Sequence, residues 1–383
     1  MVRALVLGGG IGGIVAANVL NRKLGRQHEI MLIDRRTEHR FPPSYPWLMM
    51  GWREPHKITR NLNLLNKKGI KYVNDEIEKI DPTNRLVKTK SNDFKYDYLI
   101  VALGAELAPE TIPGFAQGAY HMYELEEAMK TREALKNFSG GTLIVDIASL
   151  PFKCPAAPYE AAFFMDYRFR KRGIRNKIEM HFFTAEGRPM GVAPPEIGNK
   201  VVEMLESRGI TYHPNLKLTT VDSEEKKITF ENGESMSFDL LFAIPPHKAP
   251  KVVKQSGLAD ESGWIPVDKN TLKTKFDDVF ALGDVNKIML AMGMPLPKAG
   301  VFAHLQAEVV AHNIAADILG YRKKEYNGWG ECFLEIGYGK AGLVKGNFYA
   351  EPIPDAKMQW PPLSRIWHWS KVIFEKYWFW RWF

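Results

Sequence analysis

The run Gly8-Gly9-Gly10-Ile11-Gly12-Gly13 decides the fold of this chain, because Gly8, Gly10 and Gly13 satisfy the pattern Gly-x-Gly-x-x-Gly. Glycine at these places permits a tight turn, close approach of a pyrophosphate and close packing of a helix on a strand. The apolar residues 2–7 predict a β-strand before the loop, and residues 11–24 predict a helix after it. The first turn of that helix, at Ile11 and Gly12, would then direct unpaired N–H groups toward the phosphates.

An acidic residue follows at the distance that dinucleotide binding requires. Residues 29–34 predict the second strand of a βαβ unit, and Asp34 ends it 21 residues after Gly13. A carboxylate there accepts hydrogen bonds from a ribose hydroxyl. Arg35 is either a contact for a 2′-phosphate or a surface arginine. We also assign Ser44 to the cofactor site, in the proline-rich stretch 41–46 that interrupts regular structure.

Two further short signatures bear on which dinucleotide is bound. They are Asp97-Tyr98-Leu99-Ile100-Val101-Ala102-Leu103-Gly104-Ala105 and Val279-Phe280-Ala281-Leu282-Gly283-Asp284. Both resemble segments of the flavoproteins that contain two dinucleotide-binding domains. The resemblance implies contacts from Ala102 and Gly104, close backbone approach at Gly283, and an acceptor at Asp284 for the ribityl chain. The resident cofactor expected from these signatures is FAD rather than NAD.

A second α/β block starts near residue 140 and lacks the same loop. We expect a strand over 142–147, a helix over 156–172 and a strand over 178–184. No glycine occurs between Gly141 and Gly173, so a pyrophosphate could not approach this turn closely. A nicotinamide site is therefore not predicted here, and Cys154 occupies its place.

These patterns predict an α/β protein with two Rossmann-like dinucleotide-binding domains, as in disulfide reductases and type II NADH dehydrogenases. We expect a discontinuous FAD domain over 1–110 and 265–325. A second domain over 111–264 carries Cys154. A C-terminal region over 326–383 carries Cys332 in a hairpin, followed by an amphipathic membrane-binding helix.

Cys154 and Cys332 are the two cysteines of the chain, which excludes a disulfide-stapled scaffold and a four-cysteine metal site, and no metal is predicted. They form a redox pair, contribute one reactive thiol, or are inert buried residues. The formal net charge of +8 favours anionic partners. Long Lys/Arg blocks are absent, so nucleic acid is not expected.

The chain resembles the sulfide:quinone oxidoreductase family, whose close relative is the flavin subunit of flavocytochrome c sulfide dehydrogenase. The most specific elements are Lys153-Cys154-Pro155-Ala156-Ala157-Pro158-Tyr159-Glu160 and Pro297-Lys298-Ala299-Gly300-Val301. The resemblance implies that Cys154 and Cys332 meet over one face of the flavin ring. It assigns proton handling to Glu160, for which a helix-dipole carboxylate is the alternative. Lys298 and the helix start at Gly300 would stabilise negative charge on reduced flavin.

Two departures from the family pattern concern proton and sulfur handling. Many members carry a third cysteine upstream of the position of Cys154, and this chain has none. The family's histidine is also missing, because the run Ala185-Glu186-Gly187-Arg188-Pro189-Met190 contains no histidine.

The last 24 residues are rich in tryptophan. Six of the ten tryptophans lie between Trp360 and Trp382. Arg365, His368, Lys371 and Glu375 recur every three or four positions and predict one polar face of a helix. The opposite side carries Leu363, Ile366, Trp367, Ile373, Phe374, Tyr377 and Trp378. Such a helix is typical of an in-plane membrane anchor, and a packing helix or a homo-oligomer interface is the alternative.

The expected activity is FAD-dependent oxidation of sulfide to sulfur or polysulfide, with electron transfer to a membrane quinone. We expect a monotopic membrane protein without a signal peptide or spanning helix, on the cytoplasmic face. The alternatives are a sulfide dehydrogenase with a cytochrome acceptor, a type II NADH:quinone oxidoreductase, and a non-catalytic flavin-binding membrane protein.

Overall fold

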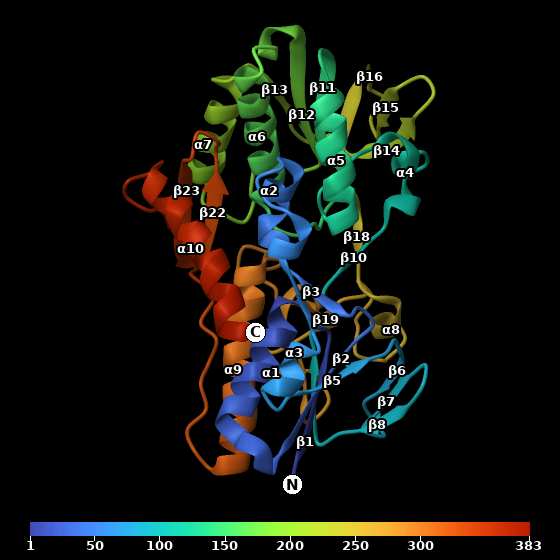
Figure 1. The fold of residues 1–383 in the computed structure, drawn as a ribbon, viewed down its shortest axis with the longest axis vertical. Helices are drawn as coiled ribbons and strands as arrows, with labels where there is room; N and C mark the ends of the chain where they lie inside the picture. The colour runs from blue at the N-terminus through green and yellow to red at the C-terminus, as the bar shows by residue number, and fades with distance from the viewer.

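The computed structural model describes all of residues 1–383 and shows an α/β fold built on two parallel sheets (Figure 1). The first sheet has the order β20-β9-β1-β2-β5. Its strands are β20 (Val279–Ala281), β9 (Tyr98–Val101), β1 (Arg3–Leu7), β2 (Glu29–Asp34) and β5 (Lys71–Asn74). The central strand β1 is buried between two parallel neighbours, which explains its run of apolar residues.

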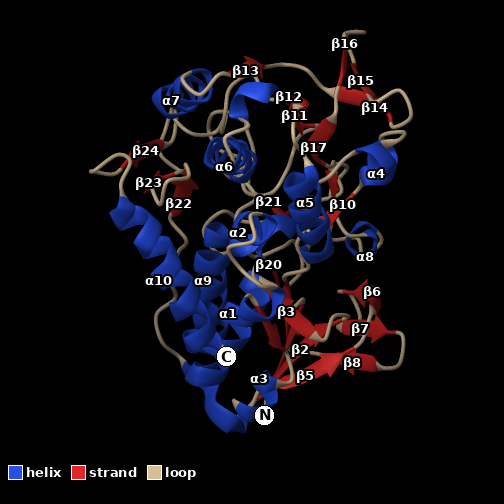
Figure 2. Ribbon diagram, turned by 45° about the horizontal axis from the view of Figure 1, so that its top comes forward, coloured by secondary structure: helices blue, strands red, loops and turns tan.

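Two long helices cover one face of the first sheet. They are α1 (Ile11–Leu24), which starts at the glycine loop, and α9 (Gly300–Leu319). The two helices pack side by side (Figure 2). A Cβ on Gly300 would lie 2.6 Å from the side chain of Ile11, so the N-termini of both helices converge on one region. That region lies at the carboxyl ends of β1 and β20, where ligands bind in open α/β sheets.

The second sheet has the order β13-β12-β11-β17 and is also parallel. Its strands are β13 (Ile210–His213), β12 (Ile178–Thr184), β11 (Gly141–Ile147) and β17 (Leu240–Ile244), and its long helices are α5 (Leu125–Asn137), α6 (Ala157–Lys171) and α7 (Pro195–Glu206). The helix α6 follows β11 through the turn that carries Cys154. Pro158 lies in the first turn of α6, where a missing N–H removes no hydrogen bond of the helix.

Three small antiparallel sheets surround these layers. They are β6 (Ile77–Asp81), β7 (Leu86–Thr89) and β8 (Asp93–Lys95); β14 (Leu218–Asp222), β15 (Lys227–Phe230) and β16 (Ser235–Ser237); and β22 (Trp329–Glu335), β23 (Ala341–Asn347) and β24 (Asp355–Met358). Two-stranded pairs are β3 (Glu38–Arg40) with β4 (Thr59–Asn61), β10 (Glu106–Leu107) with β18 (His247–Lys248), and β19 (Ile265–Pro266) with β21 (Asn286–Lys287). Short helices are α2 (Tyr45–Met49), α3 (Leu64–Lys67), α4 (Phe115–Gly118) and α8 (Lys251–Lys254).

The last helix, α10 (Arg365–Trp382), runs from the β22–β24 sheet toward α1 and α9 and ends beside them (Figure 1). Its residues Trp378, Phe379 and Trp382 belong to the same core of 75 buried residues that runs through both parallel sheets. The helix is therefore integrated into the fold. None of the helices combines the length and apolar character needed to span a bilayer.

The predicted α/β class with parallel sheets is confirmed, and most predicted elements lie within two residues of their observed bounds. The helix α1 and the strand β2 have the predicted bounds. The hairpin expected from Cys332 begins at Trp329 and has a third strand. The helix expected at the tryptophan-rich end is observed as α10, and Trp378, one of the residues placed opposite its polar face, is buried.

Candidate functional site

The two cysteines meet in space although 178 positions separate them. Cys154 lies in the turn between β11 and α6, and Cys332 lies within β22. Both are free thiols, and they lie close enough for Cys154 to act on the Cys332 thiol, whose S–H donates a 3.4 Å hydrogen bond to the Phe333 carbonyl. The neighbouring Cys154 thiol and burial raise the pKa of Cys332 well above its usual range. The fold therefore brings the two thiols together, and a pair of thiols in this arrangement has the chemistry to form or break one sulfur–sulfur bond.

The backbone around Cys154 is held in a conformation that few non-glycine residues adopt. Its φ is +54°, in the left-handed region. The Cys154 amide donates a 2.7 Å hydrogen bond to the carbonyl oxygen of Lys298, and its own carbonyl accepts one of 3.0 Å from Ala157. The segment before α9 and the start of α6 therefore fix the turn. Such over-determined strain is typical of functional sites.

A buried carboxylate and a buried ammonium lie beside the thiols. Glu160 is only 3% exposed, and its Oε1 accepts a 2.9 Å hydrogen bond from Lys371 Nζ and one of 2.8 Å from the amide of Glu335. Burial raises the pKa of Glu160, and the Lys371 charge opposes that rise. Burial disfavours the Lys371 ammonium, but the carboxylates of Glu160 and Glu335 reverse this and raise its pKa. The sequence marked Lys371 as one polar residue of a helix and did not indicate this contact.

The glycine loop has the open space that a pyrophosphate needs. A Cβ on Gly10 would meet no atom within 4 Å, and the same is true of Gly104, whose φ is +70°. Gly8 and Gly13 serve the fold instead: a Cβ on Gly13 would overlap the carbonyl oxygen of Gly8, and one on Gly8 would overlap that of Ala102. A Cβ on Gly12 would overlap Leu282. The loop therefore packs tightly on the sheet side and is open at Gly10.

Asp284 carries a buried carboxyl oxygen two residues after Leu282, which packs against Gly12. Its Oδ1 has no hydrogen-bond partner, and burial raises the pKa of Asp284 against the charges of Lys153 and Lys298. Gly283 next to it has φ +73°, and Gln306 accepts a 2.8 Å hydrogen bond from its amide. An unpaired buried acceptor is costly unless a ligand satisfies it. Together with the open loop, Asp284 fits a dinucleotide with a ribityl or ribose hydroxyl.

Lys298 lies between this aspartate and the cysteine turn. Its ammonium donates hydrogen bonds of 2.6 Å to the Asp284 carbonyl and 3.3 Å to the Asn286 carbonyl, and it covers the ring of Trp264 at 3.4 Å. Burial lowers the pKa of Lys298 to about 8, although the Asp284 charge opposes the shift. Two hydrogen bonds thus connect Cys154 to Lys298 and Lys298 to Asp284. The proposed cofactor cradle and the thiol pair form one continuous site.

The second cofactor acid, Asp34, is already anchored by the chain. Its carboxylate accepts hydrogen bonds of 2.6 Å from the Gly9 amide and 2.7 Å from the Arg36 amide. The Arg36 guanidinium also pairs with Asp34, at 3.4 Å. Arg35 points away, is largely exposed and lies 3.6 Å from Glu76. The structure thus brings Arg36 against this carboxylate and leaves Arg35 at the surface, which was one of the two expectations for it.

Ser44 lies at the junction with the last helix. Its hydroxyl donates a 2.5 Å hydrogen bond to Glu375, whose carboxylate also accepts 2.9 Å bonds from Arg53. His39, buried nearby, contacts the Gly9 carbonyl at 2.9 Å through Nδ1, and the Trp378 indole lies 3.2 Å from its Nε2. Since a carbonyl only accepts, Nδ1 carries the proton and Nε2 accepts from the indole. This histidine, which sequence reasoning missed, joins the glycine loop to α10.

In the second parallel sheet, the acidic residue at the position where a ribose would bind is already hydrogen-bonded within the protein. Glu186 follows the end of β12, as Asp34 ends β2. Its carboxylate accepts a 2.6 Å hydrogen bond from the Tyr159 hydroxyl of α6. Burial raises the pKa of Glu186 to about 7, and the Tyr159 bond opposes the shift. The place of Glu186 just after a strand was the signal in the sequence that could have indicated it. That segment was read only for the histidine that it lacks.

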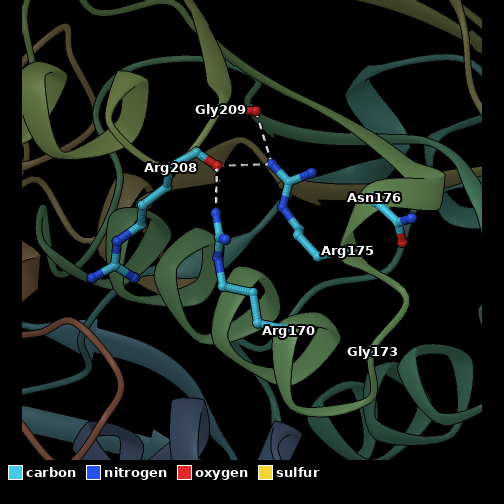
Figure 3. Close-up of a pocket in the computed structure, with 6 residues that line it drawn as sticks. All are labelled: Arg170, Gly173, Arg175, Asn176, Arg208 and Gly209. Carbon is cyan, nitrogen blue, oxygen red and sulfur yellow. Dashed lines mark hydrogen bonds between the residues drawn. The ribbon is translucent and has the colours of Figure 1, made fainter.

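An open hollow of about 530 Å³ lies elsewhere, at the ends of α6 and α7 (Figure 3). It is lined by Arg170, Gly173, Arg175, Asn176, Arg208 and Gly209. Arg170 and Arg175 donate to the buried Asp166 and to the Arg208 carbonyl. These guanidinium groups thus satisfy a buried carboxylate and a backbone carbonyl near the ends of α6 and α7. No residue of the cysteine site lines the hollow.

Comparison with known proteins agrees with this geometry. Residues 2–294 match the family model described as pyridine nucleotide-disulphide oxidoreductase. The sulfide-quinone reductase of Aquifex aeolicus is 30% identical over 98% of this chain and 90% of its own length. The chain belongs to the sulfide:quinone oxidoreductase family. The mitochondrial sulfide:quinone oxidoreductase of Mus musculus is 29% identical over 91% of this chain and 79% of its own.

The solved structure of the sulfide:quinone oxidoreductase from Aquifex aeolicus superposes on the whole chain. Its TM-score is 0.89 at 27% identity, and the match covers 100% of this chain and 91% of the other. Sulfide:quinone oxidoreductases belong to a family of FAD-dependent oxidoreductases, so the predicted family and enzyme class are confirmed. The roles of individual residues are argued below.

Proposed function

We propose that this protein oxidises sulfide at Cys154 and Cys332 and transfers the electrons through FAD to quinone. The observation that carries the proposal is that the two thiols lie close together. The Cys154 amide is hydrogen-bonded to the Lys298 carbonyl and the Lys298 ammonium to the Asp284 carbonyl, in a region that fits a dinucleotide. Gly10, Gly104, Asp34 and Asp284 would hold the cofactor. Bound FAD supplies a two-electron acceptor beside the sulfur atoms.

The thiol pair accounts for the sulfur chemistry with balanced atoms and electrons. Hydrosulfide attacks the oxidised Cys154–Cys332 bond, which breaks to give one persulfide and one thiolate. The persulfide then loses its proton, two electrons leave, the cysteine–cysteine bond forms again and one sulfur atom is released. One hydrosulfide thus yields one sulfur atom, one proton and two electrons, and quinone takes up the electrons with two protons.

Several charges favour the anionic species in this cycle. The Lys371 ammonium opposes the rise in the pKa of Cys332, and Lys298, whose carbonyl accepts from the Cys154 amide, adds a half-buried cation. A cation near a thiol lowers the cost of the thiolate, which is the nucleophilic form. Glu160 has a pKa raised by burial and lies beside the pair, so it is suited to accept the proton that sulfide releases.

The exposed side of α10 supports contact with a membrane. The polar side chains of this helix, His368, Lys371 and Glu375, are hydrogen-bonded to other elements of the fold. In contrast, Ile373 and Trp380 are 65% and 77% exposed. Ile366, Trp369, Phe374 and Tyr377 are also exposed. A helix with its apolar residues outward and its polar residues inward suits the interface of a bilayer, from which quinone would enter. A second copy of the chain on this face is the alternative.

Anaerobic titration with sulfide tests the proposal. We expect sulfide to bleach the bound flavin and a soluble quinone to restore its absorbance. Cys154→Ser and Cys332→Ser should retain FAD and lose the bleaching. Normal bleaching in either variant contradicts the thiol-pair mechanism. Reoxidation by cytochrome c but not by quinone favours the cytochrome-linked alternative.

A further inference from the structure

A buried histidine that the sulfide chemistry does not use lies where the chain passes from the second sheet back to the first. His247 belongs to β18, whose antiparallel partner is β10, and Figure 1 shows this short pair between the two parallel sheets. His247 is only 8% exposed. The contacts of its ring therefore show which part of this junction it borders.

The two ring nitrogens of His247 have different surroundings. Nδ1 lies 2.8 Å from the carbonyl oxygen of Pro245, and since a carbonyl only accepts, Nδ1 carries the proton. Nε2 is buried and has no hydrogen-bond partner. Burial and the nearby Lys153 charge lower the pKa of His247 well below its ordinary value, so the ring is neutral and Nε2 is an acceptor. A buried acceptor without a partner is costly unless a ligand supplies a donor.

Two series of contacts connect His247 to the open glycine turn at Gly104. Along the backbone, Leu107 in the strand that follows Gly104 pairs with His247. Through side chains, the His247 ring packs edge-to-face on Tyr123 with ring centroids 5.3 Å apart, and the Tyr123 hydroxyl donates a 2.8 Å hydrogen bond to the Lys153 carbonyl. The Lys153 ammonium in turn lies 3.4 Å from the carbonyl oxygen of the residue after Gly104. The imidazole thus borders the turn whose open space fits the cofactor.

The same region contains a second buried acceptor without a partner, Oδ1 of Asp284. The backbones of Lys153 and Lys298 form a parallel β-bridge, and the Lys298 ammonium donates a 2.6 Å hydrogen bond to the Asp284 carbonyl. The contacts from Asp284 to His247 are therefore unbroken. Two unpartnered acceptors and two ammonium groups suit a ligand that carries both hydrogen-bond donors and acceptors.

We propose, on the basis of the proposed FAD binding, that Nε2 of His247 accepts a hydrogen bond from an N–H or O–H group of bound FAD. Oxidised flavin offers the ring N3–H and the ribityl hydroxyls as donors, and reduction adds N5–H. A neutral imidazole accepts from any of these groups, whereas a protonated ring would not. The segment after β17 thus helps to hold the cofactor, together with the glycine loop and Asp284 of the first sheet.

The affinity for FAD and the reduction potential of the holoenzyme test this contact without sulfide. His247→Asn can still donate to the Pro245 carbonyl but has no atom at the place of Nε2. If the donor belongs to oxidised flavin, the dissociation constant of FAD should rise about threefold to tenfold, the range for one lost hydrogen bond. If the donor is N5–H, only reduced FAD should bind more weakly by this factor, and the potential should fall.

His247→Gln restores an acceptor near the place of Nε2 and should lie closer to the unmodified protein in both measurements. Melting of each holoenzyme shows whether it is folded, and His247→Leu replaces His247→Asn if that variant does not fold. His181→Leu is the matched control, because His181 is equally buried at 7% and its Nδ1 lies 3.0 Å from Nε2 of His213. It should leave the affinity for FAD and the potential unchanged.

Unaltered affinity for oxidised FAD and unaltered potential in the folded His247→Asn holoenzyme overturn the contact. Equal losses in His247→Asn and His247→Gln that follow their melting temperatures show a structural role and also overturn it. If sulfide fails to bleach the unmodified holoenzyme while His247→Asn still weakens FAD binding, the proposed sulfide oxidation is wrong and the contact stands.

Discussion

Lys371 and Glu160 form a buried ion pair of 2.9 Å, although 211 positions separate them in the chain. Lys371 lies on the last helix, and Glu160 lies on the helix that follows Cys154. The pair therefore joins α10 to the thiol site. Because both groups are buried, water cannot replace a lost partner. Removal of either charge should therefore change both the stability of the protein and the chemistry of the thiols.

Lys371→Met should destabilise the protein by about 3–5 kcal/mol, the usual cost of leaving one charge of a buried pair without its partner. It should also raise the pKa of Cys332 further, because the ammonium currently opposes that rise. Denaturant unfolding and the pH dependence of thiol alkylation measure the two effects. Lys376→Met is the control on the same helix, since Lys376 is exposed. The double variant Lys371→Met with Glu160→Gln should recover part of the stability, and an additive loss would contradict a direct pair.

Gly10→Val should abolish FAD binding without preventing folding. A Cβ at Gly10 meets no atom of the chain, whereas the pyrophosphate would need this space. Gly13→Ala should instead destabilise the fold, because its Cβ would overlap the Gly8 carbonyl. Flavin content by absorbance and melting of both variants distinguish the two glycines. Full FAD occupancy in a folded Gly10→Val protein would place the cofactor elsewhere.

The sequence predicts the framework because its signals are local. The strand β2 and the helix α1 follow from apolar periodicity next to a glycine loop, and the parallel sheet follows from their order. The pairing of Cys154 with Cys332 required a family resemblance, because nothing in the spacing of two cysteines states that they meet. The structure then brings them close together.

The orientation of α10 could not be read from periodicity. A polar stripe is usually assigned to solvent, yet His368, Lys371 and Glu375 point inward. Their partners Glu335, Glu160 and Ser44 lie far away in the chain, and only the fold brings them together. The sequence could not indicate the partner of Ser44 for the same reason. We assigned Ser44 to the cofactor site, and in the structure its hydroxyl donates to Glu375.

Asp146→Asn should change the pH dependence of stability. Asp146 lies within β11, both of its carboxyl oxygens are buried without a partner, and burial raises its pKa well above the usual range. A raised folded-state pKa means that the folded protein holds this proton more tightly than the unfolded chain. Stability from this group is therefore retained below the unfolded pKa of about 3.9. It is lost as the pH rises from that value toward the folded pKa, by about 1.4 kcal/mol for each pH unit.

Urea unfolding at pH 4.5 and pH 8 measures this contribution. The gain in the free energy of unfolding for Asp146→Asn over the unmodified protein should be larger at pH 8 than at pH 4.5. Asp239→Asn is a suitable comparison, because Asp239 accepts a 2.8 Å hydrogen bond from the Thr142 amide and should not stabilise when changed. An equal effect of Asp146→Asn at both pH values contradicts a buried, protonated carboxyl.

Ile373→Glu should weaken binding to lipid vesicles while leaving the fold intact. The side chain is 65% exposed on the outward face of α10, so a charge there meets water in the free protein and hydrocarbon in the bound one. Co-sedimentation with vesicles of mixed neutral and anionic lipid measures binding. Leu319→Glu, at the exposed end of α9, is the matched control. Unchanged sedimentation of Ile373→Glu would favour an oligomer interface, which size-exclusion chromatography of both variants would reveal.

NADH should fail to bleach the flavin that sulfide bleaches. The turn after β11 has no glycine to admit a pyrophosphate. The Glu186 carboxylate, which a ribose would need, already accepts a hydrogen bond from the Tyr159 hydroxyl. The two reductants are compared in one anaerobic cuvette, with flavin absorbance as the readout. Bleaching by NADH at a rate close to that with sulfide would show that the second sheet still binds a nicotinamide. Tyr159→Phe frees the Glu186 carboxylate but leaves the closed turn. It should therefore remain unreactive toward NADH, which separates the effect of the turn from that of the acid.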